Sequence, residues 1–222
     1  MSKRYTAIIM LMLLAFVAAG ILIGLMPDEV PLHYNMAGEV DRVGNRYENL
    51  LLPVVTAGMG LFFIGIARHA VKKGEERNGK VTATVGIAVM IWFNLMNLYF
   101  LLQAVSYSRT EGLLQRVDAM RFTAIGLGIV IFITCNFMPK ATRNAMFGLR
   151  TTWSMKNDRV WQKCQRFGGF SGMILGAIMI LSAIFMSGNA AMIMLSILLF
   201  VWVFLCVYMS YRYYKEDEKA NA

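Results

Sequence analysis

The stretch FGGFSGMILGAIMILSAIFMSGNAAMIMLSILLFVWVFLCVYMSY, residues 167–211, runs for 45 positions without a charged side chain. As a single helix it would extend about 67 Å at 1.5 Å per residue, more than twice the roughly 30 Å hydrocarbon core of a bilayer. The tripeptide Ser-Gly-Asn at 187–189 lies in its middle, and these residue types are typical of a tight turn. The stretch therefore predicts a hairpin of two membrane-spanning helices, over residues 170–186 and 191–211.

Four more charge-free runs precede this hairpin, and each is long enough for one helix. Only 16% of the 222 residues are charged, against about 25% in soluble domains, which excludes both a soluble globule and a disordered chain. We therefore predict an all-α integral membrane protein of the cell membrane with six transmembrane helices. The first run exceeds the core of a signal peptide, so we expect it to be retained rather than cleaved. The first four helices are predicted over residues 5–25, 50–67, 82–106 and 122–138.

The distribution of basic residues predicts how these helices are oriented. If the N-terminus lies inside, 17 of the 22 Lys and Arg residues lie in inner segments. The five outer ones are Arg42, Arg46, Arg109, Arg116 and Arg121. Because basic residues in short loops stay on the cytoplasmic side, we predict that both termini are cytoplasmic. The net charge of +9 then reflects topology and attraction to the lipid bilayer, and we expect no direct nucleic-acid binding.

The predicted spans contain no Asp, Glu, Lys, Arg or His, which argues against a proton relay through the membrane. Asn94 and Asn97 share one helix face. We interpret them as partners in helix–helix hydrogen bonds, with a polar substrate path as the alternative. Small residues predict close helix packing at Gly20 and Gly24, and again at the glycines spaced by four over residues 168–176. The cysteines all lie on the inner side in this arrangement, as a reducing cytosol requires.

The outer segments are predicted to be ordered loops. Residues 27–48 are rich in Pro, Gly and Asn, which favours a turn-rich structure. His33, Glu39 and Asp41 lie in this segment, but one histidine without helical or cysteine spacing is a weak signal for a metal or for catalysis. We favour a structural or recognition loop and expect no metal. In the second outer segment, apolar residues over 113–120 predict a short amphipathic helix at the membrane interface.

The inner segment 139–169 contains seven basic residues and one acidic residue. Apolar residues at helical spacing over 160–167 predict a second short interfacial helix, capped by Asn157 and ended by Gly168. Tryptophan and basic side chains favour such an interfacial position. The alternative interpretation is a docking platform for a cytosolic partner.

The same segment carries a family motif. It consists of NFMPK at 136–140, Arg-Asn at 143–144, GLRTTWSMKN at 148–157, VWQK at 160–163 and RFGG at 166–169. This pattern resembles the central motif of the SdpI family, which are bacterial multi-pass immunity and signal-transduction membrane proteins. The first outer segment, with PLHYN at 31–35 and GEVDRVG at 38–44, resembles the membrane domain of unknown function that precedes this motif in many members.

The resemblance also divides the chain into two domains. Residues 1–70 would form an N-terminal two-helix membrane domain with the outer loop 27–48. Residues 71–222 would form an SdpI-like four-helix membrane domain with the cytoplasmic motif loop 139–169. Family members usually have histidine where Gln165 stands, so no role that needs a titrating imidazole is expected there.

The resemblance implies a membrane immunity protein that protects a cell against a secreted antimicrobial peptide toxin. It further implies a receptor that, with toxin present, holds a small winged-helix repressor at the membrane. The partner-binding residues of the inner motif would be Arg150, Thr151, Thr152, Trp153, Lys156, Trp161, Lys163 and Arg166. The outer recognition residues would be His33, Tyr34, Asn35, Gly38 and Glu39.

Two other functions stay open at the level of sequence. One is an envelope-stress or small-solute passage protein without a toxin partner, because many family members lie outside toxin clusters. The other is a membrane enzyme that uses His33 with Glu39 or Asp41. We favour the immunity function and expect neither enzymatic activity nor a cofactor.

Overall fold

The computed structural model describes residues 2–35, 40–107 and 118–220. Within these ranges, six helices are long and apolar enough to cross a membrane. The helices are α1 (Lys3–Ile23), α2 (Leu51–Lys72), α3 (Glu76–Ser106), α4 (Ala119–Phe137), α5 (Asp158–Phe185) and α6 (Gly188–Ala220). The prediction of an all-α multi-pass membrane protein is confirmed, and α5 and α6 are joined at the turn predicted within the longest apolar run.

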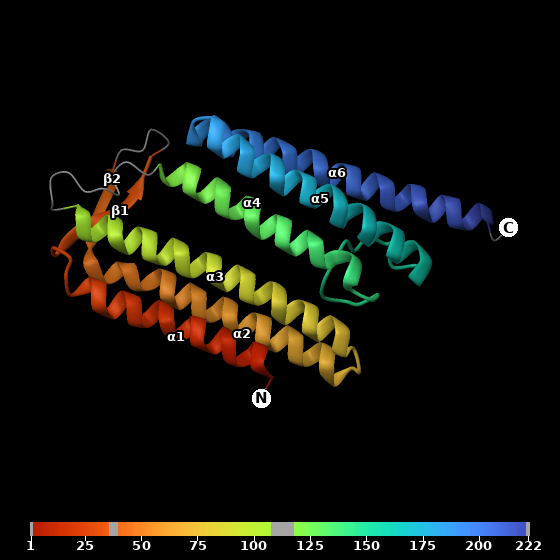
Figure 1. Ribbon diagram of the computed structural model, residues 1–222, viewed down its shortest axis with the longest axis horizontal. Helices are drawn as coiled ribbons and strands as arrows, with labels where there is room; N and C mark the ends of the chain where they lie inside the picture. Colours follow the sequence, from red (N-terminus) through yellow and green to blue (C-terminus); the bar gives the residue numbers. More distant parts are fainter. Residues whose placement is uncertain (1, 36–39, 108–117, 221–222) are drawn as a thin grey trace.

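The helices lie side by side in two groups of three (Figure 1). The first group is α1, α2 and α3, the second is α4, α5 and α6, and α3 lies next to α4 where the groups meet. Asn94 and Asn97 of α3 donate side-chain hydrogen bonds to the backbone carbonyls of Leu11 and Ala15 of α1, each at 3.1 Å. These contacts support their interpretation as helix–helix hydrogen bonds. The predicted domain boundary at residue 70 does not coincide with this grouping, and it stays a prediction about sequence units.

Large apolar side chains cover the outside of both groups. Phe204 of α6 is 72% exposed and Leu13 of α1 is 55% exposed. In water such a surface would be unfavourable, whereas lipid acyl chains solvate it well. The exposed apolar faces are therefore the surfaces that meet the bilayer.

Glycines allow α4 and α5 to approach closely. A Cβ atom on Gly176 would lie 2.7 Å from the carbonyl oxygen of Gly128, and one on Gly128 would lie 2.9 Å from the carbonyl oxygen of Gly176. The close packing predicted for the glycines of α5 is confirmed. The same prediction for α1 is wrong, because a Cβ on Gly20 would meet no atom within 4 Å and one on Gly24 only its own helix. Both glycines of α1 lie on its exposed side.

α5 is longer than predicted, which corrects one expectation. The interfacial helix predicted from residue 157 onward is the first part of α5, and Gly168 does not end it. Asn157 caps the helix as predicted, since its side-chain oxygen accepts a hydrogen bond from the N–H of Val160 at 2.9 Å. A Cβ on Gly168 would lie 2.9 Å from the terminal methyl of Met138, so this glycine admits a neighbouring side chain and does not serve as a cap. The other predicted interfacial helix, over 113–120, lies outside the described residues except for the start of α4.

A two-stranded hairpin stands at one end of the helix bundle (Figure 1). β1 (Glu29–Tyr34) pairs with β2 (Val40–Asn45) in antiparallel register, and the short 3₁₀ helix η1 (Arg46–Leu50) leads from β2 into α2. We call this end the hairpin end. The sequence predicted an ordered, turn-rich loop over 27–48, but it did not predict strands there.

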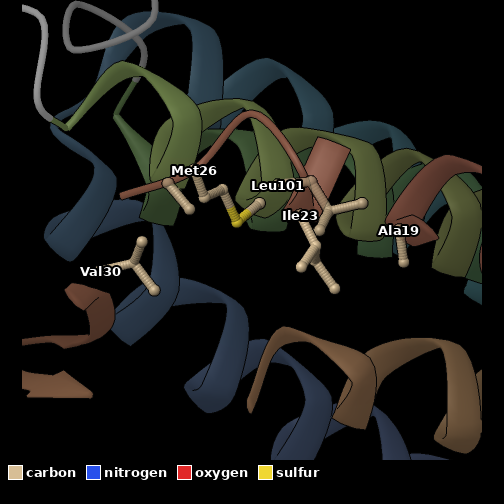
Figure 2. Close-up of a cluster of buried hydrophobic side chains, with 6 residues drawn as sticks. Ala19, Ile23, Met26, Val30 and Leu101 are labelled. Atoms are coloured by element: carbon tan, nitrogen blue, oxygen red, sulfur yellow. The ribbon is translucent and has the colours of Figure 1, made fainter. Parts of the chain in front are cut away.

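Val30 anchors the hairpin to the helices. Its side chain is fully buried in a cluster with Ala19 and Ile23 of α1, Met26 just after α1, and Leu101 of α3 (Figure 2). Burying an apolar side chain of this size contributes about 1.5–3 kcal/mol. The hairpin therefore has a defined position on α1 and α3.

Candidate functional site

The segment that carries the family motif forms an irregular loop at the end of the molecule opposite the hairpin (Figure 1). The 3₁₀ helix η3 (Met138–Lys140) closes α4, and residues 141–157, here called the motif loop, lead to the start of α5. Because an irregular backbone lacks the repeating hydrogen bonds of a helix, its polar groups need other partners. In the motif loop, buried side chains provide many of them.

Asn144 builds the first turn of the motif loop. Its side chain is buried, and its oxygen accepts hydrogen bonds from the N–H groups of Met146 and Phe147, each at 2.7 Å. Its amide nitrogen donates to the carbonyls of Thr142 and Phe147 at 2.7 Å and 3.1 Å. Asparagine is a turn residue because its side chain satisfies nearby backbone groups in this way.

Gln165 of α5 holds the middle of the motif loop. The side chain is 1% exposed, and its oxygen accepts from the N–H of Leu149 while its nitrogen donates to the carbonyl of Leu149, both at 2.9 Å. The preceding Gly148 has a φ of +108°, and a Cβ there would lie 2.5 Å from the Gln165 oxygen. Glycine fits both the left-handed backbone and the close approach of the amide.

A second turn follows at Thr151 and Ser154. The Ser154 hydroxyl donates to the carbonyl of Leu149 at 2.9 Å and accepts from the N–H of Thr151 at 2.8 Å. The Thr151 hydroxyl accepts from the N–H of Ser154 at 3.0 Å and also bonds the hydroxyl of Ser210 on α6. Hydrogen bonds within the turn and one to α6 thus hold this turn in place.

α6 extends beyond its apolar run and supports the motif loop from one side. The ring of Trp153 packs edge to face on Tyr211, with ring centroids 5.2 Å apart. Asn157 donates to the carboxylate of Asp217 at 2.7 Å, and the guanidinium of Arg159 lies 3.4 Å from the same carboxylate. Asp217 is only 7% exposed, and a carboxylate at that depth needs such partners to offset its lost hydration.

α3 supports the motif loop from the other side. Asn78 is 2% exposed, and its side-chain oxygen accepts from the N–H of Thr142 at 3.0 Å. Beside this contact, the indole N–H of Trp161 on α5 donates to the carbonyl of Ala141 at 2.9 Å. The motif loop therefore connects the two groups of helices, with α3 on one side and α5 and α6 on the other.

The structure separates the predicted inner residues into supporting and exposed ones. Trp161 is 1% exposed, which corrects its prediction as a surface residue, because its indole N–H is needed to hold the loop. Thr151 and Trp153 are half-buried and bonded to α6. The exposed residues, which we call the motif face, are Arg150, Thr152, Lys156, Lys163 and Arg166.

At the hairpin end, the structure places only some of the predicted recognition residues. His33 on β1 lies across from β2, and its Nδ1 is 2.6 Å from a carboxylate oxygen of Asp41, with both side chains exposed to solvent. Tyr34 ends β1 and Asn35 follows it. Gly38 and Glu39 lie outside the residues that the structure describes.

Other charged residues of the hairpin end are also paired. The guanidinium of Arg42 lies 2.6 Å from the carboxylate of Glu48, which also accepts from the N–H of Asn45 at 3.1 Å and completes a capping box on η1. Arg46 lies 3.4 Å from Asp28. Among the described residues, no three His, Cys, Asp or Glu side chains are arranged to hold a metal ion. The hairpin presents an ordered, charged surface of the kind that can contact a peptide.

Sequence reasoning missed most of the residues that hold the motif loop. Asn78, Ser210 and Asp217 contact the loop from helices far away in the sequence, and no spacing pattern within those helices marks them. Gln165 stood out only as a departure from the family pattern. The usable signals were Asn144 and Ser154, because these residue types favour turns.

Comparison with known proteins relates both ends of the molecule to described families. The SdpI/YfhL protein family matches residues 140–210, and a domain of unknown function, DUF1648, matches residues 10–57. Over 214 residues the chain is 23% identical to "Immunity protein SdpI" of Bacillus subtilis (strain 168), an alignment that covers 96% of this chain and 97% of that protein. No solved structure matches the chain. The resemblance predicted from the motif is confirmed, and the chain is a multi-pass protein of the cell membrane.

Proposed function

We propose that this SdpI-family chain is a membrane immunity protein that protects its cell against a secreted antimicrobial peptide toxin. The observation that carries the proposal is the construction of the motif loop, in which buried Asn144, Gln165 and Trp161 hold an exposed basic face in place. The similarity to the Bacillus subtilis immunity protein supports it, because the alignment includes both the hairpin end and the motif loop.

The hairpin end is the proposed site of toxin recognition. Val30 fixes the hairpin on the helices, so its exposed residues keep a defined arrangement. Val43 and Tyr47 are 44% and 58% exposed beside the charged pairs, which gives this end both apolar and charged contacts for a peptide. In the predicted orientation, a toxin that arrives from outside meets this end first.

The motif face is the proposed site for a cytosolic winged-helix repressor. Its exposed side chains are four basic residues and one threonine. Lys163 lies 3.8 Å from Glu216 of α6, and the positive charge of Arg150, Lys156 and Arg166 complements an acidic patch on a partner. The half-buried Trp153 lies at the edge of this face, on the ring of Tyr211. Tryptophan and arginine contribute most strongly at protein interfaces, which makes Arg150 and Trp153 the proposed centre of the contact.

α3 is the proposed connection between the two sites. Leu101 near one end of this helix lies in the same buried cluster as Val30 of the hairpin, and Asn78 near the other end bonds the motif loop. Binding of the toxin and binding of the repressor would be coupled if α3 has two positions and each partner favours one of them to a different degree.

The test of the immunity function is survival of a toxin-sensitive bacterium that expresses the wild-type chain, Arg150→Ala or Lys73→Ala. Lys73 is an exposed basic residue next to α2, on the predicted cytoplasmic side but outside the motif loop, so its variant is a matched loss of one charge. Under toxin, we expect cells with the wild type or Lys73→Ala to keep their membrane potential, measured with a dye. Cells with Arg150→Ala at equal abundance should lose it.

Failure of the wild type to protect against any peptide toxin tested would contradict the immunity function. The envelope-stress or small-solute passage function would then be the one to test. Its polar path would have to include Asn94 and Asn97 of α3, whose side-chain nitrogens donate to carbonyls of α1.

A further inference from the structure

A cavity of about 560 Å³ lies beside the motif loop, between the first turns of α3 and α5. Three arginines line it, Arg77 from α3, Arg143 from the motif loop and Arg166 from α5, together with one carboxylate, Asp158. The cavity is therefore strongly positive. The residues Arg77, Arg143 and Asp158 take no part in the motif face, so this site is distinct from the proposed repressor site except for Arg166.

Of the three arginines, Arg143 already has an ion-pair partner and hydrogen-bond partners. The guanidinium of Arg143 lies 2.9 Å from Asp158 and donates to the carbonyls of Met155 and Lys156 at 3.0 Å and 3.3 Å. Arg77 and Arg166 have no ion-pair or hydrogen-bond partner anywhere in the part of the chain that the structure describes. Two guanidinium groups in one cavity without an anion between them favour a ligand that brings a negative charge.

The depth of the cavity indicates what this ligand is. Arg166 is the last charged residue before the apolar run 167–211, and Pro139 in the cavity wall ends the apolar run of α4. Arg77 lies one turn before the apolar part of α3. The cavity thus lies where the spans of α3 and α5 begin and the span of α4 ends, which is the level of lipid phosphates in a bilayer.

The surface next to the cavity is suited to acyl chains. Phe170 follows Arg166 by one helical turn on the same face of α5 and is 64% exposed. A molecule with its phosphate at Arg166 would therefore lay its hydrocarbon part along Phe170. A soluble anion would gain nothing from this apolar surface.

From these contacts we infer that the cavity binds the phosphate headgroup of an anionic phospholipid, held between Arg77 and Arg166. The walls are the motif loop and α5, and Trp161 at the back is held by its hydrogen bond to Ala141. In the predicted orientation the lipid belongs to the cytoplasmic leaflet. The bound lipid would stabilise the contact between α3 and the motif loop, because its phosphate joins an arginine of α3 to one of α5.

Native mass spectrometry of the detergent-purified full-length chain tests this inference. Phosphatidylglycerol is compared with phosphatidylcholine of the same acyl chains, which has a phosphate but no net charge. We expect the wild type to bind phosphatidylglycerol preferentially, and Arg77→Gln/Arg166→Gln to lose roughly tenfold or more of that affinity. The matched control, Lys72→Gln/Lys73→Gln, removes two exposed charges on the same predicted side and should keep it.

A second variant guards against a folding defect. Gln162 lines the cavity and is exposed, so Gln162→Glu adds a negative charge with almost no change in shape and should also weaken phosphatidylglycerol binding. An equal loss of phosphatidylglycerol affinity in the arginine and lysine variants would overturn the inference. General surface charge would then explain the preference for phosphatidylglycerol. Displacement of the lipid by an equal concentration of glycerol phosphate would overturn it in favour of a soluble anion. No toxin is present in this experiment, so its outcome is independent of the immunity function.

Discussion

At the scale of the residue, Gln165 shows how one buried amide orders an irregular loop. It satisfies both backbone groups of Leu149, and glycine at 148 leaves room for it. Histidine, which the family resemblance implies at this position, would titrate near neutral pH, whereas an amide does not. We therefore expect the motif loop of this chain to stay bonded to α5 over the pH range in which a histidine would change its charge.

Substitution of Gln165 by alanine should release the middle of the motif loop. The backbone N–H of Leu149 would lose its partner, which costs about 1–3 kcal/mol when such a group stays buried, and the Leu149 carbonyl would keep only its hydrogen bond from Ser154. We expect faster hydrogen exchange in the motif loop and a lower unfolding temperature of the purified protein. Gln162→Ala is the matched control, since Gln162 is on the same helix but exposed. Equal effects of the two variants would refute this role of Gln165.

Gly148→Ala should be more damaging than Gly74→Ala. Both glycines have positive φ, +108° and +79°, so an alanine at either position is strained by about 1–2 kcal/mol. Only the Cβ at Gly148 meets another group, the Gln165 oxygen, whereas the space around Gly74 is open. Thermal unfolding in detergent should show the larger loss for Gly148→Ala. Equal unfolding temperatures of the two variants would mean that Gln165 moves aside without a loss of stability.

At the scale of the element, the contact between α4 and α5 depends on backbone approaching backbone. A Cβ on Gly128 or on Gly176 would lie within 2.9 Å of the carbonyl oxygen of the other, so the two backbones approach each other directly there. In membranes, where apolar side chains gain little by leaving lipid, such close packing is a main source of helix association. Gly20 and Gly24, at the end of α1, are four residues apart like the glycines of α5, but they lie on the exposed side.

Gly176→Ala and Gly20→Ala are therefore expected to have opposite effects. The added methyl group at Gly176 would push α4 and α5 apart and destabilise the protein by about 1–3 kcal/mol. At Gly20 the methyl group meets no atom within 4 Å, and alanine favours the helix by up to about 1 kcal/mol. Size-exclusion chromatography after heating to a series of temperatures measures the temperature at which half of each variant is lost. A stable Gly176→Ala protein would show that the α4–α5 contact tolerates a wider spacing.

At the scale of the whole molecule, the two ends differ in how they are held together. The hairpin end rests on apolar burial around Val30, whereas the motif end rests on buried polar groups such as Asn78, Gln165 and Asp217. α3 contacts both ends. A polar network of this kind has one satisfied arrangement, so we expect the motif end to be rigid in the absence of partners.

The predicted orientation can be tested with two cysteine substitutions. Val43→Cys places an exposed thiol on the hairpin, and Lys156→Cys places one on the motif loop. The three native cysteines are at most 3% exposed and should react slowly. In intact cells, a membrane-impermeant maleimide should label Val43→Cys, and should label Lys156→Cys only after permeabilisation. The reverse pattern would show that the termini are outside.

The amino-acid sequence is enough to predict how many helices cross the membrane and where their apolar parts lie, although α5 begins before its predicted start and α6 continues past its predicted end. This was predictable because a span is a local property: about 20 apolar residues in a row match the thickness of the bilayer. The same holds for the helix cap at Asn157 and the turn between α5 and α6. The family motif was likewise readable as a string of residues.

The tertiary structure alone decided which of those residues face a partner and which hold the loop. Trp161 is buried because Ala141 folds back onto it, and Gln165 orders the loop because Gly148 leaves it room. Asn78 bonds Thr142 across 64 positions of sequence, a contact that no local pattern records. The placement of the hairpin on α1 and α3, the two groups of helices and the arginine cavity arise in the same way. Each depends on residues brought together from distant parts of the chain, whereas sequence patterns report only on neighbours.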